Sequence, residues 1–435
     1  MNQLPALRAA PQVRPWKKGD VLVLFGELFS RGYANGLVEE AERCGLTVVR
    51  ATVGRRDKDG TLRALNAEEV ASIPKPFINV PLEAGFDLEP SAGGKTPIDF
   101  IKDVKLSEWE NATLDGASLE DSRTRSVARF RKNTTEFLKL LEPQLPAGAN
   151  VIFAHLMAGG VPRTKIVMPL LNRVVKGTGE RALASEKMWT SPIGQFCAAN
   201  FREVTAETYR HLIELSAPLR EKIKNQGGRV SYLAYGYHGT EIRIGEEWRW
   251  QTYTPYLQGW AKLALEEIST KAKAQGISSC VYNCPEILTN SSSIFQGVEV
   301  SLYPLLESFR VMAPNSAHTQ RILKTAAELL TNGDSVFATI KTITDAYFSN
   351  PLIQEHCQLS KWPQHSNPQQ LEIMLKASDD LIALHKDPKK LLTAELSEVV
   401  FAACGQHMLH DAWEARQPVA WLSHDAVVNA TCARP

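Results

Sequence analysis

The sequence predicts a doubly wound α/β fold, in which helices cover both faces of a mostly parallel sheet. Short apolar runs rich in Val, Ile and Phe alternate with long amphipathic segments, which is the pattern of βαβ units. No internal repeat or low-complexity tract interrupts this alternation. The 435 residues allow two or three domains, or one large unit with insertions.

The first half of the chain contains four expected strands and two expected helices. Residues 21–25 form a continuous apolar run ended by Gly26, which predicts a buried strand. The helix over 32–44 follows from an apolar face and from Gly45 as its C-cap. The other elements are strands over 46–53, 76–80 and 151–154, and a helix over 118–141.

The second half continues the alternation and leads us to expect one elaborated domain. Helices over 205–225 and 255–275 end at glycines, and strands over 229–234 and 277–282 follow them. The pattern is then helical to about residue 349, and again near residues 394–413. The expected parts are a leader (1–18), the main domain (19–349) with insertions at about 83–115 and 165–204, and a helical C-terminal extension (350–435) that packs on the same domain.

The overall charge excludes several classes of partner. Lys and Arg number 49 against 48 Asp and Glu, which leaves a formal charge of +1. We therefore expect neither nucleic acid nor an anionic membrane surface as a partner. No apolar run reaches the roughly 18 residues of a membrane span, and the N-terminus lacks the apolar core of a secretory signal. The expected location is the cytoplasm.

The seven cysteines are widely spaced and include no Cys-x-x-Cys pair, so we expect reduced thiols. Cys404, His407 and His410 are candidate zinc ligands, because they lie at i, i+3 and i+6 on an expected helix. They have no evident fourth ligand, and packing in the helical cap is the better interpretation. We therefore expect no metal.

The ends of the first two strands indicate a dinucleotide site. Gly26, Gly32 and Gly36 lie in the first turn, where glycines let the backbone approach a pyrophosphate. Their spacing differs from Gly-x-Gly-x-x-Gly, and an ordinary glycine turn is the alternative. Arg55 and Arg56 follow the second strand, where basic residues suit the 2′-phosphate of NADPH. We expect a Rossmann-like fold that uses NADPH, with NADH possible.

Later strand ends supply candidate catalytic groups. Ala158 is one of several small residues that would let a nicotinamide lie over the sheet edge, and Tyr235 ends the next strand. Tyr253 immediately precedes a helix, and Lys262 lies about two turns inside it. A phenol beside an ammonium can stabilise a carbonyl oxygen that becomes negative as hydride arrives. An aromatic helix start that packs on the core is the alternative.

The loop after the strand at 277–282 is the last expected part of the site. The hydroxyl of Thr289 could contact a pyrophosphate, and the apolar segment that follows could wall an acyl pocket. An apolar helix that belongs to the core is the alternative. The candidate substrate-binding residues are Tyr235, Tyr256, Ser291, Ser292, Ile294 and Phe295.

These segments together resemble the short-chain dehydrogenase/reductase superfamily, and within it the FabV type of trans-2-enoyl-ACP reductase. The likeness runs in consistent order from about residue 21 to residue 331. The same pattern is compatible with the FabMG enoyl reductases, and the two types stay open here. Four places carry the likeness: Gly32-Tyr33-Ala34, Tyr235, the Tyr-x8-Lys spacing from Tyr253 to Lys262, and the segment from Thr289 to Leu306.

The resemblance implies an NAD(P)H-dependent oxidoreductase that saturates the trans-2 double bond of an enoyl-ACP or enoyl-CoA thioester, in fatty-acid or polyketide-type synthesis. Tyr253 would be the catalytic phenol, Lys262 would hold the cofactor, and Tyr235 would be a second phenol near the thioester carbonyl. We expect a monomer or a homodimer. The implied cofactor-binding residues are Gly26, Gly32, Tyr33, Arg55, Arg56, Ala158, Lys262 and Thr289.

Two other functions stay open. A β-ketoacyl thioester reductase, or another carbonyl reductase of the same superfamily, would use the tyrosine to protonate an alkoxide. The wide separation of Tyr253 and Lys262 favours enoyl reduction instead. A dinucleotide-binding sensor without turnover would bind NADPH and reduce no thioester.

Overall fold

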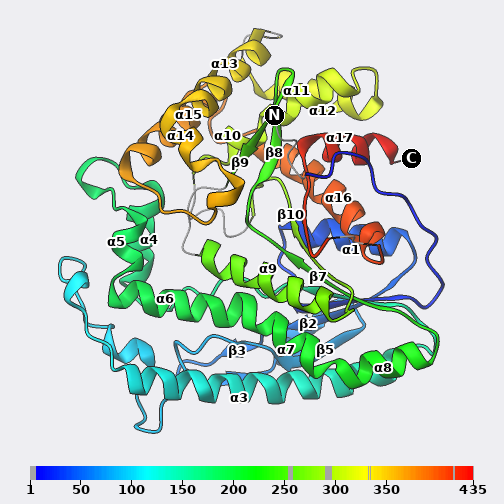
Figure 1. Cartoon of the computed structure of the whole chain (residues 1–435), viewed down its shortest axis with the longest axis vertical. Coiled ribbons are helices and arrows are strands. Elements are labelled where there is room, and N and C mark those ends of the chain that lie inside the picture. The colour runs from blue at the N-terminus through cyan, green and yellow to red at the C-terminus, as the bar shows by residue number, and fades with distance from the viewer. Residues whose placement is uncertain are drawn as a thin grey trace.

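The computed structural model describes residues 6–252, 258–289, 296–331, 333, 335–414 and 417–434. Within these residues a seven-stranded sheet has the order β11-β10-β7-β6-β1-β2-β5, and all its strands are parallel (Figure 1). The predicted Rossmann-like doubly wound fold is confirmed. The strands are β1 (Val21–Glu27), β2 (Thr47–Thr52), β5 (Phe77–Pro81), β6 (Val151–His155), β7 (Val230–Tyr235), β10 (Ser279–Asn283) and β11 (Val419–Trp421).

Both faces of β1 are buried, because its alternate residues belong to two different cores. Leu22 and Leu24 pack with residues of α1 and α16, whereas Phe25 packs with residues of α3, α7 and α9. A strand buried on both faces reads as a continuous apolar run, which is why the sequence predicted it well. These helices are α1 (Tyr33–Arg43), α3 (Gly116–Leu141), α7 (Thr208–Leu215), α9 (Gln258–Ala274) and α16 (Thr393–Asp411).

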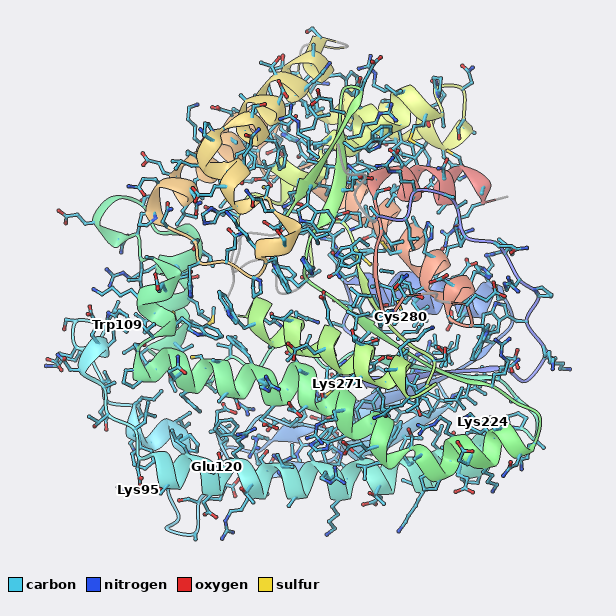
Figure 2. All side chains as sticks on the ribbon, viewed as in Figure 1. Lys95, Trp109, Glu120, Lys224, Lys271 and Cys280 are labelled. Carbon is cyan, nitrogen blue, oxygen red and sulfur yellow. The ribbon has the colours of Figure 1, made fainter. Side chains whose placement is uncertain are left out.

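Side chains fill the space between the sheet and the helices on either face (Figure 2). Cys280 of β10 lies in the interior, and Lys224 lies on the exposed surface of α8.

The other helices are α2 (Ala67–Ala71), α4 (Val167–Lys176), α5 (Ser185–Trp189), α6 (Pro192–Arg202), α8 (Ala217–Asn225), α10 (Val298–Leu302), α11 (Pro304–Met312), α12 (Ala317–Leu329), α13 (Ser335–Ser349), α14 (Pro351–His356), α15 (Pro368–Ile382) and α17 (His424–Ala433).

The two expected insertions pack against each other. Ile101 and Trp109 of the first insertion share an apolar cluster with Val167 and Leu170 of α4 and Phe196 of α6 (Figure 2). The division of the chain at residues 18 and 349 stays a prediction. No helix in the described part of the chain combines the length and the apolar character that a bilayer crossing needs.

The C-terminal extension contains a strand as well as the expected helices. Val419–Trp421 pairs with β10 and forms one edge of the sheet, and Leu7 of the leader pairs with Leu422. Two antiparallel hairpins were also not expected, β3–β4 (Arg55–Arg56 and Leu62–Arg63) and β8–β9 (Thr240–Ile244 and Glu247–Gln251). β3, β4 and β11 have only two or three residues, which are too few to establish a period in the sequence.

Gly36 has a packing role that differs from the one expected. It lies inside α1, and a Cβ added there would come within 1.8 Å of the Phe401 carbonyl oxygen of α16. Gly405 approaches the same point of α1 from the other helix. Gly36 therefore allows α1 and α16 to meet, and it does not lie in the turn before α1.

Candidate active site

A cavity of about 240 Å³ opens at the carboxyl ends of the strands. It lies over β1, β2, β5 and β6, at the point where the order of the sheet reverses and ligands of such folds bind. Gly26 is required here, because its φ is +125° and a Cβ would lie 3.1 Å from the Leu156 backbone. The lining includes Glu27, Val53, Glu83, Ala158, Gly160 and Arg163.

Two side-chain hydrogen bonds fix the loop after β6, which lines this cavity. Gly160 has a φ of +104°, and a Cβ there would lie 2.8 Å from the carbonyl oxygen of Asn200. Asn200 Nδ2 donates to the Gly160 carbonyl oxygen at 2.7 Å, and Thr205 Oγ1 donates to that of Gly159 at 3.1 Å. These hydrogen bonds leave Ala158, a predicted cofactor residue, exposed in the cavity wall.

Arg55 and Arg56 are both paired with carboxylates. The Arg55 guanidinium donates to the two oxygens of Glu27 at 2.8 and 2.9 Å. Arg56 lies 2.6 Å from Glu83 and 4.0 Å from Glu89. Their positive charges are therefore balanced within the chain, although sequence position alone favoured a site for a 2′-phosphate.

Glu27, the last residue of β1, reaches the end of β2. Its Oε2 accepts hydrogen bonds from Thr52 Oγ1 at 2.9 Å and from the Val53 N–H at 3.3 Å, both at the end of β2. Burial opposes ionisation of the Glu27 carboxyl, but hydrogen bonds from Arg55 and Thr52 outweigh it and lower its pKa. We did not predict Glu27, because the strand was expected to end before it. The sequence signal for Glu27 is that this acidic residue directly follows Gly26.

Two tyrosines contact each other near the carboxyl ends of β7 and β10. The rings of Tyr33 and Tyr235 stack with centroids 5.7 Å apart, and Tyr33 Oη donates to the Pro285 carbonyl oxygen at 2.6 Å. Tyr235 Oη is buried and has no hydrogen-bond partner among the described residues. Burial raises the pKa of Tyr235 well above its usual value, so its phenol stays protonated. It is a hydrogen-bond donor that a substrate oxygen could satisfy.

Lys262 contacts the backbone of Tyr235. Lys262 is 6% exposed, and its ammonium donates to the Tyr235 carbonyl oxygen at 2.5 Å. Burial lowers the pKa of Lys262 to about 8, and the negative charge of Glu266 opposes this fall. The buried His155 lies near it, and burial together with the Lys262 charge lowers the pKa of that imidazole, which is therefore neutral. His155 contacts Thr208 Oγ1 at 2.8 Å, a structural role.

The structure therefore gathers the predicted residues in two groups. Tyr33 stacks on Tyr235, Lys262 contacts the Tyr235 carbonyl, and Gly32 is the residue before α1. Gly26, Ala158 and the Arg55–Glu27 pair lie around the cavity, and Thr289 follows β10. The predicted Tyr253, Tyr256, Ser291, Ser292, Ile294 and Phe295 lie outside the described residues.

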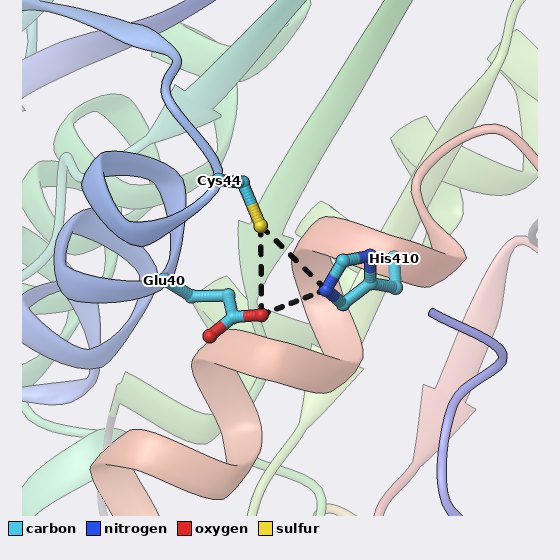
Figure 3. Close-up of side chains that lie close together, drawn as sticks. All are labelled: Glu40, Cys44 and His410. Carbon is cyan, nitrogen blue, oxygen red and sulfur yellow. Dashed lines mark hydrogen bonds and ion pairs between the residues drawn. The ribbon is translucent and has the colours of Figure 1, made fainter. Parts of the chain in front are cut away.

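The three residues weighed as zinc ligands do not point to one place. Cys404 is buried in the core, whereas His407 Nε2 contacts the Ala426 carbonyl oxygen at 3.2 Å. His410 instead faces α1, where its Nε2 lies 2.7 Å from Glu40 Oε1 and 4.0 Å from Cys44 Sγ (Figure 3). Cys404, His407 and His410 therefore do not form one ligand set.

Glu40, Cys44 and His410 form a hydrogen-bonded cluster between α1 and α16 (Figure 3). The Glu40 carboxylate also accepts hydrogen bonds from the guanidiniums of Arg43, at 2.6 and 2.9 Å, and Arg434, at 3.3 Å. Two guanidiniums beside the carboxylate would repel an added cation. We therefore assign this cluster a structural role in joining the two helices.

The strand order, the cavity at the sheet reversal and the buried lysine held at the end of β7 define a Rossmann-fold, dinucleotide-dependent oxidoreductase. Residues 3–431 match the family model described as enoyl-acyl carrier protein reductase FabMG. The chain belongs to this family and is an enoyl reductase. Of the two types that the sequence left open, the comparison selects FabMG.

Solved structures agree with this assignment. The chain is similar to the apo structure of a FabMG described as a novel type of enoyl-acyl carrier protein reductase, with 43% identity and a TM-score of 0.93 over 99% of this chain and 98% of that one. It is also similar to an NADH-bound FabMG structure, with 36% identity and a TM-score of 0.77 over 99% of both chains. Comparison with curated proteins gives no match.

Proposed function

We propose that this enoyl reductase carries out its chemistry where Tyr33, Tyr235 and Lys262 meet, with the cofactor lying along the crevice to Glu27. The observation that carries the proposal is the buried Lys262 ammonium, held at 2.5 Å from the Tyr235 carbonyl oxygen at the end of β7. The Tyr235 phenol is itself buried and has no hydrogen-bond partner among the described residues. An unsatisfied buried donor is costly unless a ligand satisfies it. A thioester carbonyl oxygen supplies the missing acceptor.

The residues present fit a nicotinamide dinucleotide. Gly26 and the exposed Ala158 leave backbone accessible at the sheet reversal, and the cavity beyond them reaches Glu27. Lys262 would hold the nicotinamide ribose at the opposite end. A nicotinamide dinucleotide, when bound, supplies the hydride that saturates the double bond.

The tyrosines and the lysine stabilise charge on the thioester. The Tyr235 phenol donates a hydrogen bond to the carbonyl oxygen, which becomes negative as the enolate forms. The Lys262 ammonium lies behind it and adds positive charge in a water-poor environment. Tyr253 remains our proposed principal phenol, because the resemblance gives it the Tyr-x8-Lys position. Protonation of the α-carbon then completes the reaction.

We further propose NADH as the preferred cofactor. The Glu27 carboxylate, held at the end of β2 by Thr52 and Val53, is placed to accept a ribose 2′-hydroxyl. Because Glu27 pairs with Arg55, no uncompensated cation is left there for a 2′-phosphate. The expectation of NADPH rested on Arg55 and Arg56. Both arginines are paired with carboxylates, so neither is a free cation that would favour a 2′-phosphate.

The substrate carrier, the location and the oligomeric state are further proposals. We propose acyl carrier protein as the carrier, because the family takes its description from that substrate. The expectations of a cytoplasmic location and of a monomer or homodimer stay predictions.

The test is oxidation of NADH and NADPH by the purified protein with crotonyl-ACP, crotonyl-CoA and a β-ketoacyl thioester. We expect consumption of NADH with the enoyl substrates and faster turnover of the ACP form. Reduction of the β-ketoacyl thioester alone would favour the carbonyl reductase. Tight cofactor binding without turnover of any thioester would favour the sensor.

A further inference from the structure

Phe29 presents an exposed ring at the wall of the cavity over the strand ends. It lies in the loop between β1 and α1, it is 56% exposed, and it lines the cavity together with Glu27 and Val53. Every other phenylalanine among the described residues is buried or half-buried. An exposed ring forgoes the free energy that the burial of apolar surface provides. At the wall of a ligand cavity, such a ring indicates a surface that the ligand covers.

The loop that carries Phe29 is held in one conformation by α1. Asn35 Nδ2 donates to the carbonyl oxygen of Phe29 at 3.1 Å and to that of Gly32 at 3.2 Å. Leu28, the residue before Phe29, packs against the core below the sheet end. The backbone therefore turns one apolar side chain inward and leaves the next one at the cavity.

The length of this loop differs from that of the usual dinucleotide turn. In Gly-x-Gly-x-x-Gly, closely spaced glycines let bare backbone approach the pyrophosphate. Here five residues separate Gly26 from Gly32, and Phe29 is the middle one. The longer loop therefore brings an aromatic side chain to the cavity, which the shorter turn has no room to carry.

The rest of the cavity wall suits a planar base with a polar edge. Apolar side chains and carboxylates both contribute to it, namely Leu156, Val161 and Val204, and Glu83 and Asp87. A purine has two apolar faces and a rim of hydrogen-bonding nitrogens, so it matches such a mixed wall.

The position of the cavity selects one half of the cofactor. Among the described residues that line it, neither Tyr235 nor Lys262 is present. The proposed function places the nicotinamide ribose at Lys262 and the 2′-hydroxyl of the adenosine ribose at Glu27. The cavity beside Glu27 therefore receives the adenosine half.

We propose that Phe29 is a cofactor-binding residue whose ring stacks on the adenine of the nicotinamide dinucleotide. This rests on the cofactor position given in the proposed function. Stacked aromatic rings gain free energy beyond the burial of their area, and adenine offers the flat face that stacking needs. Phe29 lies away from the reacting end of the site, so it contributes to cofactor affinity and not to the chemical step.

The experiment measures binding to the whole protein. Calorimetry gives the dissociation constant of NADH, and competition against NADH gives the inhibition constants of 5′-AMP and nicotinamide mononucleotide. In Phe29→Ala we expect the constants for NADH and 5′-AMP to rise about tenfold and that for nicotinamide mononucleotide to stay the same. The KM for NADH should rise with them, while kcat at saturating NADH with crotonyl-CoA should change little.

Two control variants separate stacking from other effects. Phe29→Tyr keeps a ring of the same shape and should retain the wild-type affinities. Leu140→Ala removes another exposed apolar side chain, on α3 and 46% exposed, and should change none of the constants. Because Phe29 is exposed, its replacement by Ala should leave the urea unfolding transition in place.

The outcomes distinguish this inference from the proposed function. A wild-type protein that binds no NADH would remove the proposed function and this inference with it. If NADH binds but Phe29→Ala does not weaken it, the inference is overturned and the proposed function stands. The same holds if 5′-AMP fails to compete in the wild type, or if Phe29→Ala weakens nicotinamide mononucleotide as much as 5′-AMP.

Discussion

The ring of Tyr33, at the start of α1, stacks on the ring of Tyr235, at the end of β7, with an angle of 21° between them. Tyr33 is held in turn by its hydrogen bond to the Pro285 carbonyl after β10. The stack therefore ties three strand ends to the direction of one buried phenol. In a site that must place a donor within a fraction of an ångström, this contact limits the freedom of Tyr235.

The Tyr33–Tyr235 stack can be tested with two substitutions at one position. Tyr33→Ala removes the ring, and we expect kcat for the enoyl thioester to fall about 10- to 100-fold, as misplaced catalytic groups generally cause. Tyr33→Phe keeps the stack and loses only the bond to Pro285, so its loss should be much smaller. Steady-state kinetics of both variants give the answer. Equal losses would show that the hydrogen bond, and not the stack, matters.

The identity of the principal phenol is the second prediction. Tyr253→Phe should lower kcat by about 10²- to 10⁴-fold, which is the usual value of a positioned proton donor. Tyr256→Phe is the matched control, three residues away, and should retain most activity. A silent Tyr253→Phe together with a damaging Tyr256→Phe would move the assignment to Tyr256.

Cofactor choice is the third prediction. Glu27→Gln removes the carboxylate that pairs with Arg55 and leaves that guanidinium available to a 2′-phosphate, so we expect the ratio of kcat/KM for NADPH over NADH to rise about tenfold, equivalent to about 1.4 kcal/mol. Arg55→Ala frees the carboxylate and should lower the use of NADPH further. If Arg55→Ala and Arg56→Ala raised the KM for NADPH far more than that for NADH, the arginines would bind the 2′-phosphate after all.

The Glu40–His410 contact between α1 and α16 leads to a prediction about stability and pH. Burial opposes ionisation of Glu40, but hydrogen bonds from His410 and Arg43 outweigh it and lower its pKa to about 2 from the ordinary 4.5. A depressed pKa stabilises the fold above pH 4.5, and this contribution disappears as the pH falls toward 2. Glu40→Gln should therefore reduce the free energy of unfolding at pH 7 by about 3 kcal/mol.

Urea unfolding at several pH values measures this effect. The difference between wild type and Glu40→Gln should shrink steadily below pH 4.5. Glu39→Gln, at an exposed position next along α1, is the control and should change the unfolding free energy little. A difference that does not depend on pH would mean that packing, and not charge, is lost.

The sequence predicted those parts of the fold that repeat a period. β1 is buried on both faces and reads as an unbroken apolar run, so its position was evident. β11 has three residues and forms only because β10 provides a partner from far along the chain, so no local pattern announced it.

The sequence could place single residues along the chain but could not show which of them pair. Tyr235 and Lys262 were chosen from their positions, and the structure brings the Lys262 ammonium to the Tyr235 carbonyl; their catalytic roles stay predictions. Arg55 was read as a free cation because its partner, Glu27, belongs to a different strand.

Gly36 and Gly405, which let α1 and α16 touch, also constrain the order in which the molecule can be made. The first helix of the chain finds its partner only after about 400 residues have been synthesised, and the sheet gains its last edge strand later still. A ribosome adds roughly 5–20 residues per second, so α1 spends on the order of tens of seconds with its apolar face uncovered. We therefore expect the N-terminal half to need chaperone protection as it emerges, because the helices that complete the fold are synthesised last.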